Sequence, residues 1–155
     1  MAAPPFEQFL ENHRGPVYRF LVASVGGEHA DDCFQETFLA ALRAYPRLRD
    51  DSNPKAWIFT IAHRKALDLH RTRRRAPLPV DDLADRAAAD GDAGTDPSLW
   101  EAVAGLPPKQ SAAVALRFVA DLPYREIGHA MDTSEAAARR NVHEGLTTLR
   151  KAWRG

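Results

Sequence analysis

Four polar side chains gather where a predicted helix begins, and their chemistry suits the reading of DNA. They are Glu135, Arg139, Arg140 and Asn141, and the helix is expected over residues 134–150. Arginine is best matched to guanine, and asparagine to adenine, in the major groove. A helix that enters the groove offers its N-terminal residues to the base edges. The cluster therefore predicts contact with specific base pairs.

A shorter helix should precede this one across a tight turn. Apolar residues recur at helical spacing on both sides of the turn: Leu122, Ile127, Ala130 and Met131 before it, and Ala138, Val142, Leu146 and Leu149 after it. Between the two stripes, Asp132, Thr133 and Ser134 are side chains that cap helices well. The pattern is typical of a DNA-reading helix-turn-helix, and it also fits an ordinary helical hairpin with a solvated face.

A predicted helix over residues 54–75 combines aromatic rings with positive charge. Trp57 and Phe59 stand among Lys55, His63, Arg64 and Lys65, and the helix ends in HRTRRR. Unpaired bases need rings on which to stack and cations near their phosphates, so this helix could hold melted DNA. The alternative is that both rings are core residues and that the arginines interact with the C-terminal end of the helix. The spacing of Trp57 from Ile61 favours at least a partial core role for Trp57.

The net charge of zero hides a strong segregation of charge. Residues 1–42 carry six acids against two Arg, whereas residues 43–75 carry ten Lys and Arg against three acids. Residues 76–104 then hold seven acids against one Arg, and residues 105–155 return to eight basic against five acidic residues. Two basic blocks separated by an acidic one indicate two separate surfaces for a polyanion, although charged runs also occur on faces that are merely solvated.

The acidic block also marks a boundary between domains. Residues 77–95 are rich in Ala, Asp and Gly without a sustained apolar period, which is the composition of a flexible linker. Asp96 and Pro97 then resemble a helix N-cap followed by proline at the first helical position. No alternating strand pattern competes. The sequence therefore predicts an all-α fold of two small helical domains, at residues 1–76 and 96–155, joined by this flexible acidic linker.

Three helices are expected in the first domain. The first covers residues 6–21 and could be interrupted near Gly15 and Pro16, and the third is the basic helix described above. The second, over residues 31–45, has two distinct faces. Its apolar face is expected to bury Phe34, Phe38, Ala41, Leu42 and Tyr45, and its other face presents Asp32, Gln35, Glu36, Leu39 and Arg43.

Other functions have little support in the sequence. No apolar run is long enough to cross a membrane, and the N-terminus lacks the basic start and apolar core of a signal peptide. The single cysteine, Cys33, fits a cytoplasmic protein and is expected to pack as a small hydrophobe. The six histidines show no HExxH or similar spacing. We therefore expect no catalysis, no metal, no cofactor and no small-molecule substrate.

Three segments, in a fixed order, resemble a known family. They are DDCFQETFLAALRAYPRL at residues 31–48, PKAWIFTIAHRKALDLHRTRRR at residues 54–75, and residues 106–150 with the motifs LPPKQ, LPYREI and SEAAARR. On these motifs the chain resembles bacterial sigma factors of the extracytoplasmic-function type, the smallest members of the sigma-70 family. The resemblance implies an alternative sigma factor that binds core RNA polymerase and directs initiation at promoters with −10 and −35 elements.

The resemblance also implies partners and site residues. The clamp helices of the polymerase β′ subunit would contact Asp32, Gln35, Glu36, Leu39 and Arg43. The −10 element would contact Asn53, Lys55, Trp57, His63, Arg64, Lys65, Arg71, Arg73 and Arg74. The −35 element would contact Tyr124, Arg125, Ser134, Glu135, Arg139, Arg140, Asn141 and His143. The polymerase β flap and an anti-sigma factor are the further partners implied.

The chain departs from the family pattern at several positions. Arg64 stands where many members have asparagine, and Pro123 stands where a serine usually caps the helix. Arg140 and Asn141 replace a usual Ser-Arg pair, and Gly145 replaces alanine, which should weaken that helix by about 1 kcal/mol. Two alternatives therefore stay open. One is a stand-alone helix-turn-helix regulator that binds duplex DNA as a dimer. The other is a sigma-like protein that sequesters polymerase or a regulator without initiating.

Overall fold

The computed structural model describes residues 5–48, 53–75 and 97–154, and every element in these segments is helical. The N-terminal part consists of α1 (Phe6–Val25), α2 (Gly27–Ala44), a short 3-10 helix η1 (Tyr45–Arg47) and α3 (Pro54–Arg75). The C-terminal part consists of α4 (Pro97–Ala104), α5 (Pro108–Phe118), α6 (Tyr124–Ala130) and α7 (Glu135–Arg154). The all-α prediction is confirmed, and the linker predicted at residues 77–95 lies outside the described residues.

Local sequence explains where the first helices begin and end. α1 continues through Pro16 without the interruption considered above, because Val17 and Phe20 directly after it are fully buried in the core. It ends at Gly26, whose φ of +87° reverses the chain in a single residue. α2 therefore begins at once at Gly27, earlier than the sequence predicted. α3 begins after Asn53, whose Oδ1 accepts a hydrogen bond from a backbone N–H of the first turn at 3.2 Å.

Aromatic rings from three elements pack together at one end of the N-terminal part. The ring of Phe9 lies 5.1 Å from that of Tyr45 and 5.7 Å from that of Trp57, measured between centroids. Phe59 is fully buried and meets Phe20 edge to face at 5.6 Å. The core role that the sequence left open is therefore confirmed for Phe59, and in part for the half-buried Trp57.

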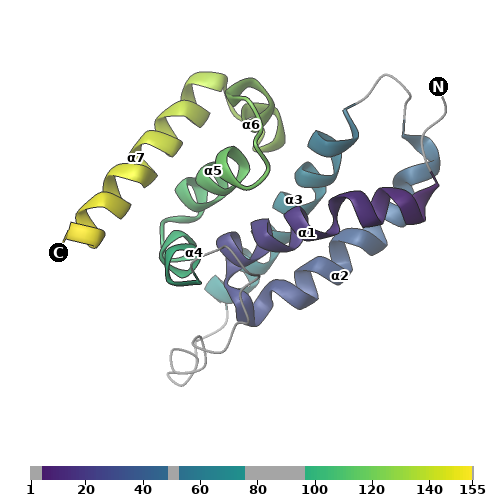
Figure 1. The fold of residues 1–155 in the computed structure, drawn as a ribbon, viewed down its shortest axis with the longest axis horizontal. Helices are drawn as coiled ribbons and strands as arrows, with labels where there is room; N and C mark the ends of the chain where they lie inside the picture. Colours follow the sequence, from purple (N-terminus) through teal and green to yellow (C-terminus); the bar gives the residue numbers. More distant parts are fainter. Residues whose placement is uncertain (1–4, 49–52, 76–96, 155) are drawn as a thin grey trace.

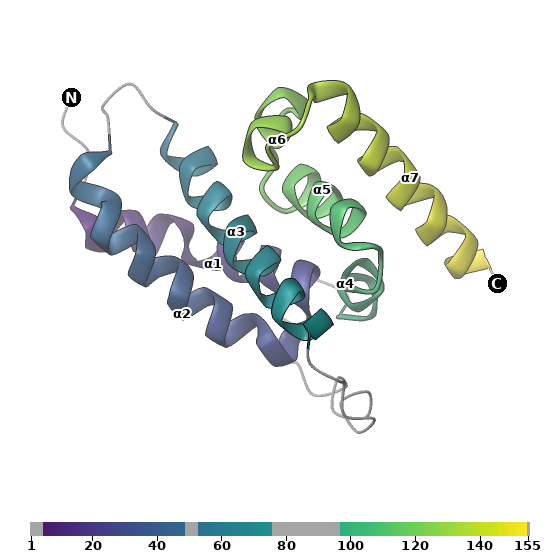
Figure 2. The same ribbon diagram turned by 180° about the vertical axis from the view of Figure 1, so that it is seen from behind.

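The two parts of the chain pack directly against each other (Figures 1 and 2). α4 and α5 lie on α1, α6 lies beside α3, and buried residues of both parts form one cluster. The Ser111 hydroxyl of α5 donates a buried hydrogen bond of 2.8 Å to the Ala23 carbonyl in the last turn of α1. The next carbonyl, of Ser24, lies 3.1 Å from Nε2 of His70 in α3. Side chains from two distant helices thus satisfy carbonyls that a helix end leaves without partners.

α7 lies at the outer edge of the C-terminal part and packs closely on α5 (Figure 1). Gly145 makes this approach possible, because a Cβ at that position would lie only 2.7 Å from Cγ2 of Val114. The sequence marked Gly145 as a weak point of its helix. In the folded protein the missing side chain is what lets the two helices meet, a packing role that the sequence did not predict.

Candidate nucleic-acid interface

The first turns of α7 present the predicted base-reading residues to solvent. Ser134 caps the helix, with its Oγ accepting a hydrogen bond of 3.0 Å from the backbone N–H of Ala137. Among the contacts predicted at the start of α7, Asn141 is half-buried and five residues are exposed: Ser134, Glu135, Arg139, Arg140 and His143. Ala138 and Val142 lie buried beneath them. The N-terminal residues of a recognition helix are the ones that contact base edges in the major groove.

The turn before α7 is fixed by close backbone contact. The N–H of Thr133 donates to the carbonyl of Gly128 at 2.8 Å, and a Cβ on Gly128 would lie 2.9 Å from the Thr133 carbonyl oxygen. Asp132 adopts a positive φ of 55°, a conformation that Asp tolerates better than most residues. Pro123 provides no side-chain cap for α6, as predicted. The predicted pair of helices around a tight turn is confirmed.

Tyr124, the first residue of α6, contacts two arginines. The guanidinium carbon of Arg117 lies 4.6 Å from the ring centroid, and that of Arg139 lies 4.9 Å from it. Arg117 also donates from Nη1 to the Leu122 carbonyl at 3.1 Å. The sequence did not predict Arg117 as a site residue, and its place within residues 106–150, the segment that carries the resemblance, was the available signal. Arg125, next to Tyr124, is exposed.

Most residues predicted for the −10 element reach the surface of α3. Asn53, Arg64 and Arg71 are exposed, and Lys55, Trp57, Lys65 and Arg73 are half-buried. Among the described residues, the ion pair that Arg71 forms with Asp68 is long, at 3.9 Å, and exposed, which leaves its charge available. Arg74 belongs to α3, but its side chain lies outside the described residues.

His63 is the exception among them. It is only 3% exposed, because its place on the helix aligns it with the buried residues Phe59 and Ala66. Burial lowers the pKa of His63 to about 4, and the charges of His70 and Arg64 add to this effect. The imidazole is therefore neutral and enclosed at neutral pH. In this packing His63 is not available to DNA, and its predicted contact stays a prediction.

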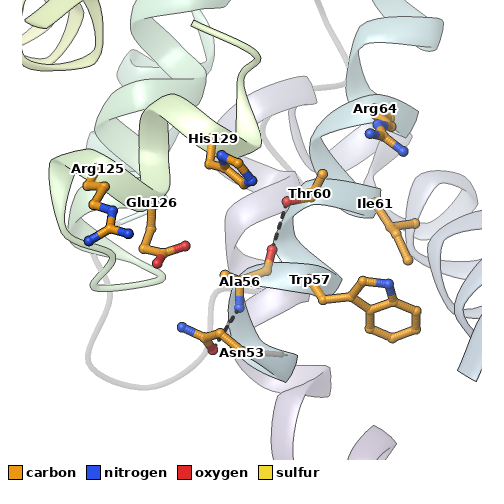
Figure 3. Close-up of a pocket in the computed structure, with 9 residues that line it drawn as sticks. All are labelled: Asn53, Ala56, Trp57, Thr60, Ile61, Arg64, Arg125, Glu126 and His129. Atoms are coloured by element: carbon orange, nitrogen blue, oxygen red, sulfur yellow. Dashed lines mark hydrogen bonds between the residues drawn. The ribbon is translucent and has the colours of Figure 1, made fainter. Parts of the chain in front are cut away.

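A cleft of about 540 Å³ separates α3 from α6 (Figure 3). Its α6 wall carries Arg125, Glu126 and His129, and its α3 wall carries Asn53, Ala56, Trp57, Thr60, Ile61 and Arg64. A second cavity of about 510 Å³ adjoins it, since both are lined by Thr60, Arg64 and His129. Side chains of α3 and α6 thus face a shared space between the N-terminal and C-terminal parts of the molecule.

The predicted polar face of α2 is also open to solvent. All five of its residues are exposed: Asp32, Gln35, Glu36, Leu39 and Arg43. Leu42, which the sequence placed in the core, is 51% exposed, whereas Phe38 and Ala41 are buried. It lies one helical turn beyond Leu39, itself 53% exposed, so the helix directs both leucines outward. Two exposed leucines among charged groups are typical of a protein-binding surface.

Features that would indicate other functions are missing from the described segments. Within residues 5–48, 53–75 and 97–154, no group of three or more His, Cys, Asp or Glu side chains is placed to hold a metal ion. No helix there combines the length and apolar character needed to cross a bilayer. Burial, followed by the nearby carboxylates of Glu36 and Asp32, raises the pKa of the Cys33 thiol to about 11. This thiol is therefore protonated and packs as the small hydrophobe predicted.

Comparison with known families agrees with this division of the chain. Residues 9–76 match the sigma-70 region 2 family, and residues 97–149 match the family described as sigma-70, region 4. We refer to the two parts as region 2 and region 4 from here on. Their order and their helical folds define a protein of the sigma-70 type.

Individual relatives narrow the class. SigD of Mycobacterium tuberculosis, an ECF RNA polymerase sigma factor, is 33% identical over 92% of this chain and 74% of its own length. CarQ of Myxococcus xanthus, an RNA polymerase sigma factor, is 34% identical over 97% of this chain and 90% of its own. The sigma factor RpoE of Bartonella quintana, solved with the anti-sigma factor NepR, shares the fold with a TM-score of 0.76 at 20% identity, covering 96% of both chains. The chain belongs to the ECF RNA polymerase sigma factors.

Proposed function

We propose that this ECF sigma factor divides promoter-specific initiation among three surfaces. The exposed stripe of α2 binds the β′ clamp helices of core RNA polymerase, α3 holds the unpaired −10 strand, and the first turns of α7 enter the −35 major groove. One observation carries the proposal: a single chain exposes a protein-binding stripe and, on two other helices, arginine-bearing faces. We also propose that the protein has no catalytic role, in keeping with its membership of the sigma factors.

The division of labour follows from the side chains on each surface. The α2 stripe offers two leucines beside Asp32 and Glu36, which suits a partner with both apolar and basic groups. On α3, the ring of Trp57 and the cation of Arg64 both line the cleft, and they supply stacking and charge for single-stranded DNA. On α7, the exposed Arg139 supplies the paired donors that guanine accepts.

We also propose that regions 2 and 4 move apart when the promoter is bound. By their names, the two elements lie roughly 25 base pairs apart, which is about 85 Å of duplex at about 3.4 Å per base pair. In the structure α6 lies beside α3, and Ser111 is bonded to Ala23. In this arrangement α3 and the first turns of α7 lie too close together to contact the −10 and −35 elements at the same time. Polymerase would then hold the separated regions at the spacing that the promoter requires.

The remaining partners follow from the family. We propose that region 4 contacts the polymerase β flap, and that an anti-sigma factor holds the protein inactive in the cytoplasm. A solved relative of the same fold was captured with an anti-sigma factor, which supports the second of these partners. Co-purification of the tagged protein under non-inducing conditions would identify the regulator.

In vitro transcription with core polymerase tests the main proposal. Core enzyme plus this protein should initiate at specific genomic promoters, whereas neither component should do so alone. Initiation at no promoter would overturn the assignment and favour a sigma-like protein that sequesters polymerase. Arg139→Ala and Arg140→Ala should each weaken −35 recognition by about 1–3 kcal/mol.

A gel-shift comparison separates the remaining alternative. A stand-alone helix-turn-helix regulator would bind duplex promoter DNA tightly without polymerase. The sigma factor should bind it poorly alone and well as holoenzyme, because each half-site is weak by itself. Tight binding of the free protein as a dimer would contradict the proposal.

A further inference from the structure

One aromatic ring joins the three helices of region 4 that frame the −35 surface. Tyr124 begins α6, Arg117 belongs to the last turn of α5, and Arg139 lies in the early turns of α7. Both guanidinium carbons lie within 5 Å of the Tyr124 ring centroid, at 4.6 and 4.9 Å. These distances are well inside the range of about 6 Å over which cation–π attraction acts.

The two arginines are not equivalent. Arg117 is half-buried, and its Nη1 donates to the Leu122 carbonyl at 3.1 Å, so it is fixed to the backbone ahead of α6. Arg139 is exposed and has no ion pair or side-chain hydrogen bond among the described residues. The ring of Tyr124 is therefore the contact that orients Arg139.

A guanidinium that packs over a ring uses its flat face and keeps its N–H donors free at its edge. Arg139 lies over the ring, and the fork of donors with which arginine recognises guanine makes no hydrogen bond among the described residues. Holding a long side chain in one geometry before binding reduces the entropy lost when the contact forms. The ring prepares the arginine without occupying its donors.

We propose that Tyr124 is a positioning residue for −35 recognition: its ring, not its hydroxyl, holds Arg139 ready for the base edges, and Arg117 fixes the ring in place. This inference rests on the proposed role of α7 in the −35 groove. The proposal predicts that the hydroxyl is dispensable, because the contact that orients Arg139 is made by the ring. The opposing possibility is that the Tyr124 hydroxyl itself contacts DNA.

Holoenzyme binding to a promoter and to its single-base −35 variants tests the proposal. Arg139→Ala first identifies the base pair whose discrimination depends on Arg139. Tyr124→Leu should reduce discrimination at that same base pair about fivefold, and Tyr124→Phe should retain it. In the Arg139→Ala background, Tyr124→Leu should have no further effect at that base pair, because Tyr124 acts through Arg139.

Each result decides between the possibilities. If Tyr124→Phe loses as much discrimination as Tyr124→Leu, the hydroxyl is the active group and the proposal is overturned. Additive effects of Tyr124→Leu and Arg139→Ala would overturn it as well. If Arg139→Ala changes nothing, the positioning role falls, and the −35 role of α7 falls with it if Arg140→Ala has no effect either. An effect of Arg139→Ala without one of Tyr124→Leu removes only the positioning role.

A measurement on the unmodified protein covers the case in which Tyr124→Leu does not fold. In nuclear magnetic resonance spectra, the δ-methylene protons of Arg139 should be shifted upfield by the Tyr124 ring. The shift should persist in Tyr124→Phe. Random-coil shifts for these protons in the folded wild-type protein would refute the stacking and the proposal with it.

Discussion

Replacing Gly145 by alanine should destabilise the protein, although alanine is the better helix former. Helix propensity alone favours alanine by about 1 kcal/mol. The added methyl group would lie 2.7 Å from Cγ2 of Val114, far inside the roughly 3.5–4.0 Å at which carbon atoms pack. Val114 is buried and β-branched within a helix, so its side chain has one strongly preferred rotamer and cannot move aside easily.

The balance of these effects sets the expected magnitude. Forced repacking of a filled core costs about 1–3 kcal/mol, which exceeds the gain in propensity. We therefore expect Gly145→Ala to lower the free energy of unfolding by about 1 kcal/mol. Urea denaturation followed by far-ultraviolet circular dichroism would show this as a lower midpoint at an unchanged slope.

A second substitution makes the reasoning refutable. Val114→Ala removes the Cγ2 atom that the new methyl group meets, so in this background Gly145→Ala should stabilise the protein by about 1 kcal/mol. The effect of the same change should thus reverse its sign. A raised midpoint for Gly145→Ala alone, or equal effects in both backgrounds, would refute the packing argument.

The α2 stripe, His63 and the Ser111 hydrogen bond each give a further test. Leu39→Asp should weaken binding to core polymerase at least about tenfold in a fluorescence titration. Leu99, in α4, is also exposed, at 36%, and Leu99→Asp should leave the affinity unchanged. Equal affinities of the two variants would contradict the role of α2. The pKa of His63 is lowered from 6.5 to about 4, so between pH 6.5 and about pH 4 this site gains a proton only in the unfolded chain. The free energy of unfolding should therefore fall as the pH falls through this range. Urea unfolding at pH 7 and pH 4.5 gives the loss of unfolding free energy between these two values. In His63→Leu this loss should be smaller than in the wild-type protein by up to about 3 kcal/mol. The same loss in both proteins would refute the role of His63. Ser111→Ala leaves the Ala23 carbonyl without its donor, which should destabilise the packing of region 4 on region 2 by about 1–3 kcal/mol. The radius of gyration in small-angle X-ray scattering should then rise. An unchanged radius would contradict the role of this hydrogen bond as a link between the regions.

Periodicity and capping residues were sufficient to predict most of the helices. The cap residues Asn53 and Ser134 each stand directly before a helix, as their chemistry predicts. The errors lie where packing decides. The pattern around Phe38 placed Leu42 in the core, but a helix face is wide enough for either assignment until its neighbours are known. Gly145 was judged by propensity alone, and its neighbour Val114 belongs to another helix.

The residues of the candidate site also fall into those that local sequence could predict and those that depend on packing. Exposed residues such as Arg140 and Glu36 follow from their place on a helix face, which local sequence defines. His63 could not be judged so, because the same basic segment supplies both surface and core positions. The stacking of Arg117 on Tyr124 depends on how α5 and α6 cross, and no pattern in a single sequence encodes that angle.

The end of α1 offers a way to observe the separation of the two regions without attaching a probe to the protein. The last turn of α1 is held there partly by Ser111 of region 4. When region 4 leaves, water replaces this donor and the last turn should fray. The amide of Gly26, which donates to the Val22 carbonyl at 2.9 Å, should then exchange its hydrogen for deuterium faster. Isotope uptake at this one turn of region 2 would therefore report the position of region 4, in the free protein and during its assembly with polymerase.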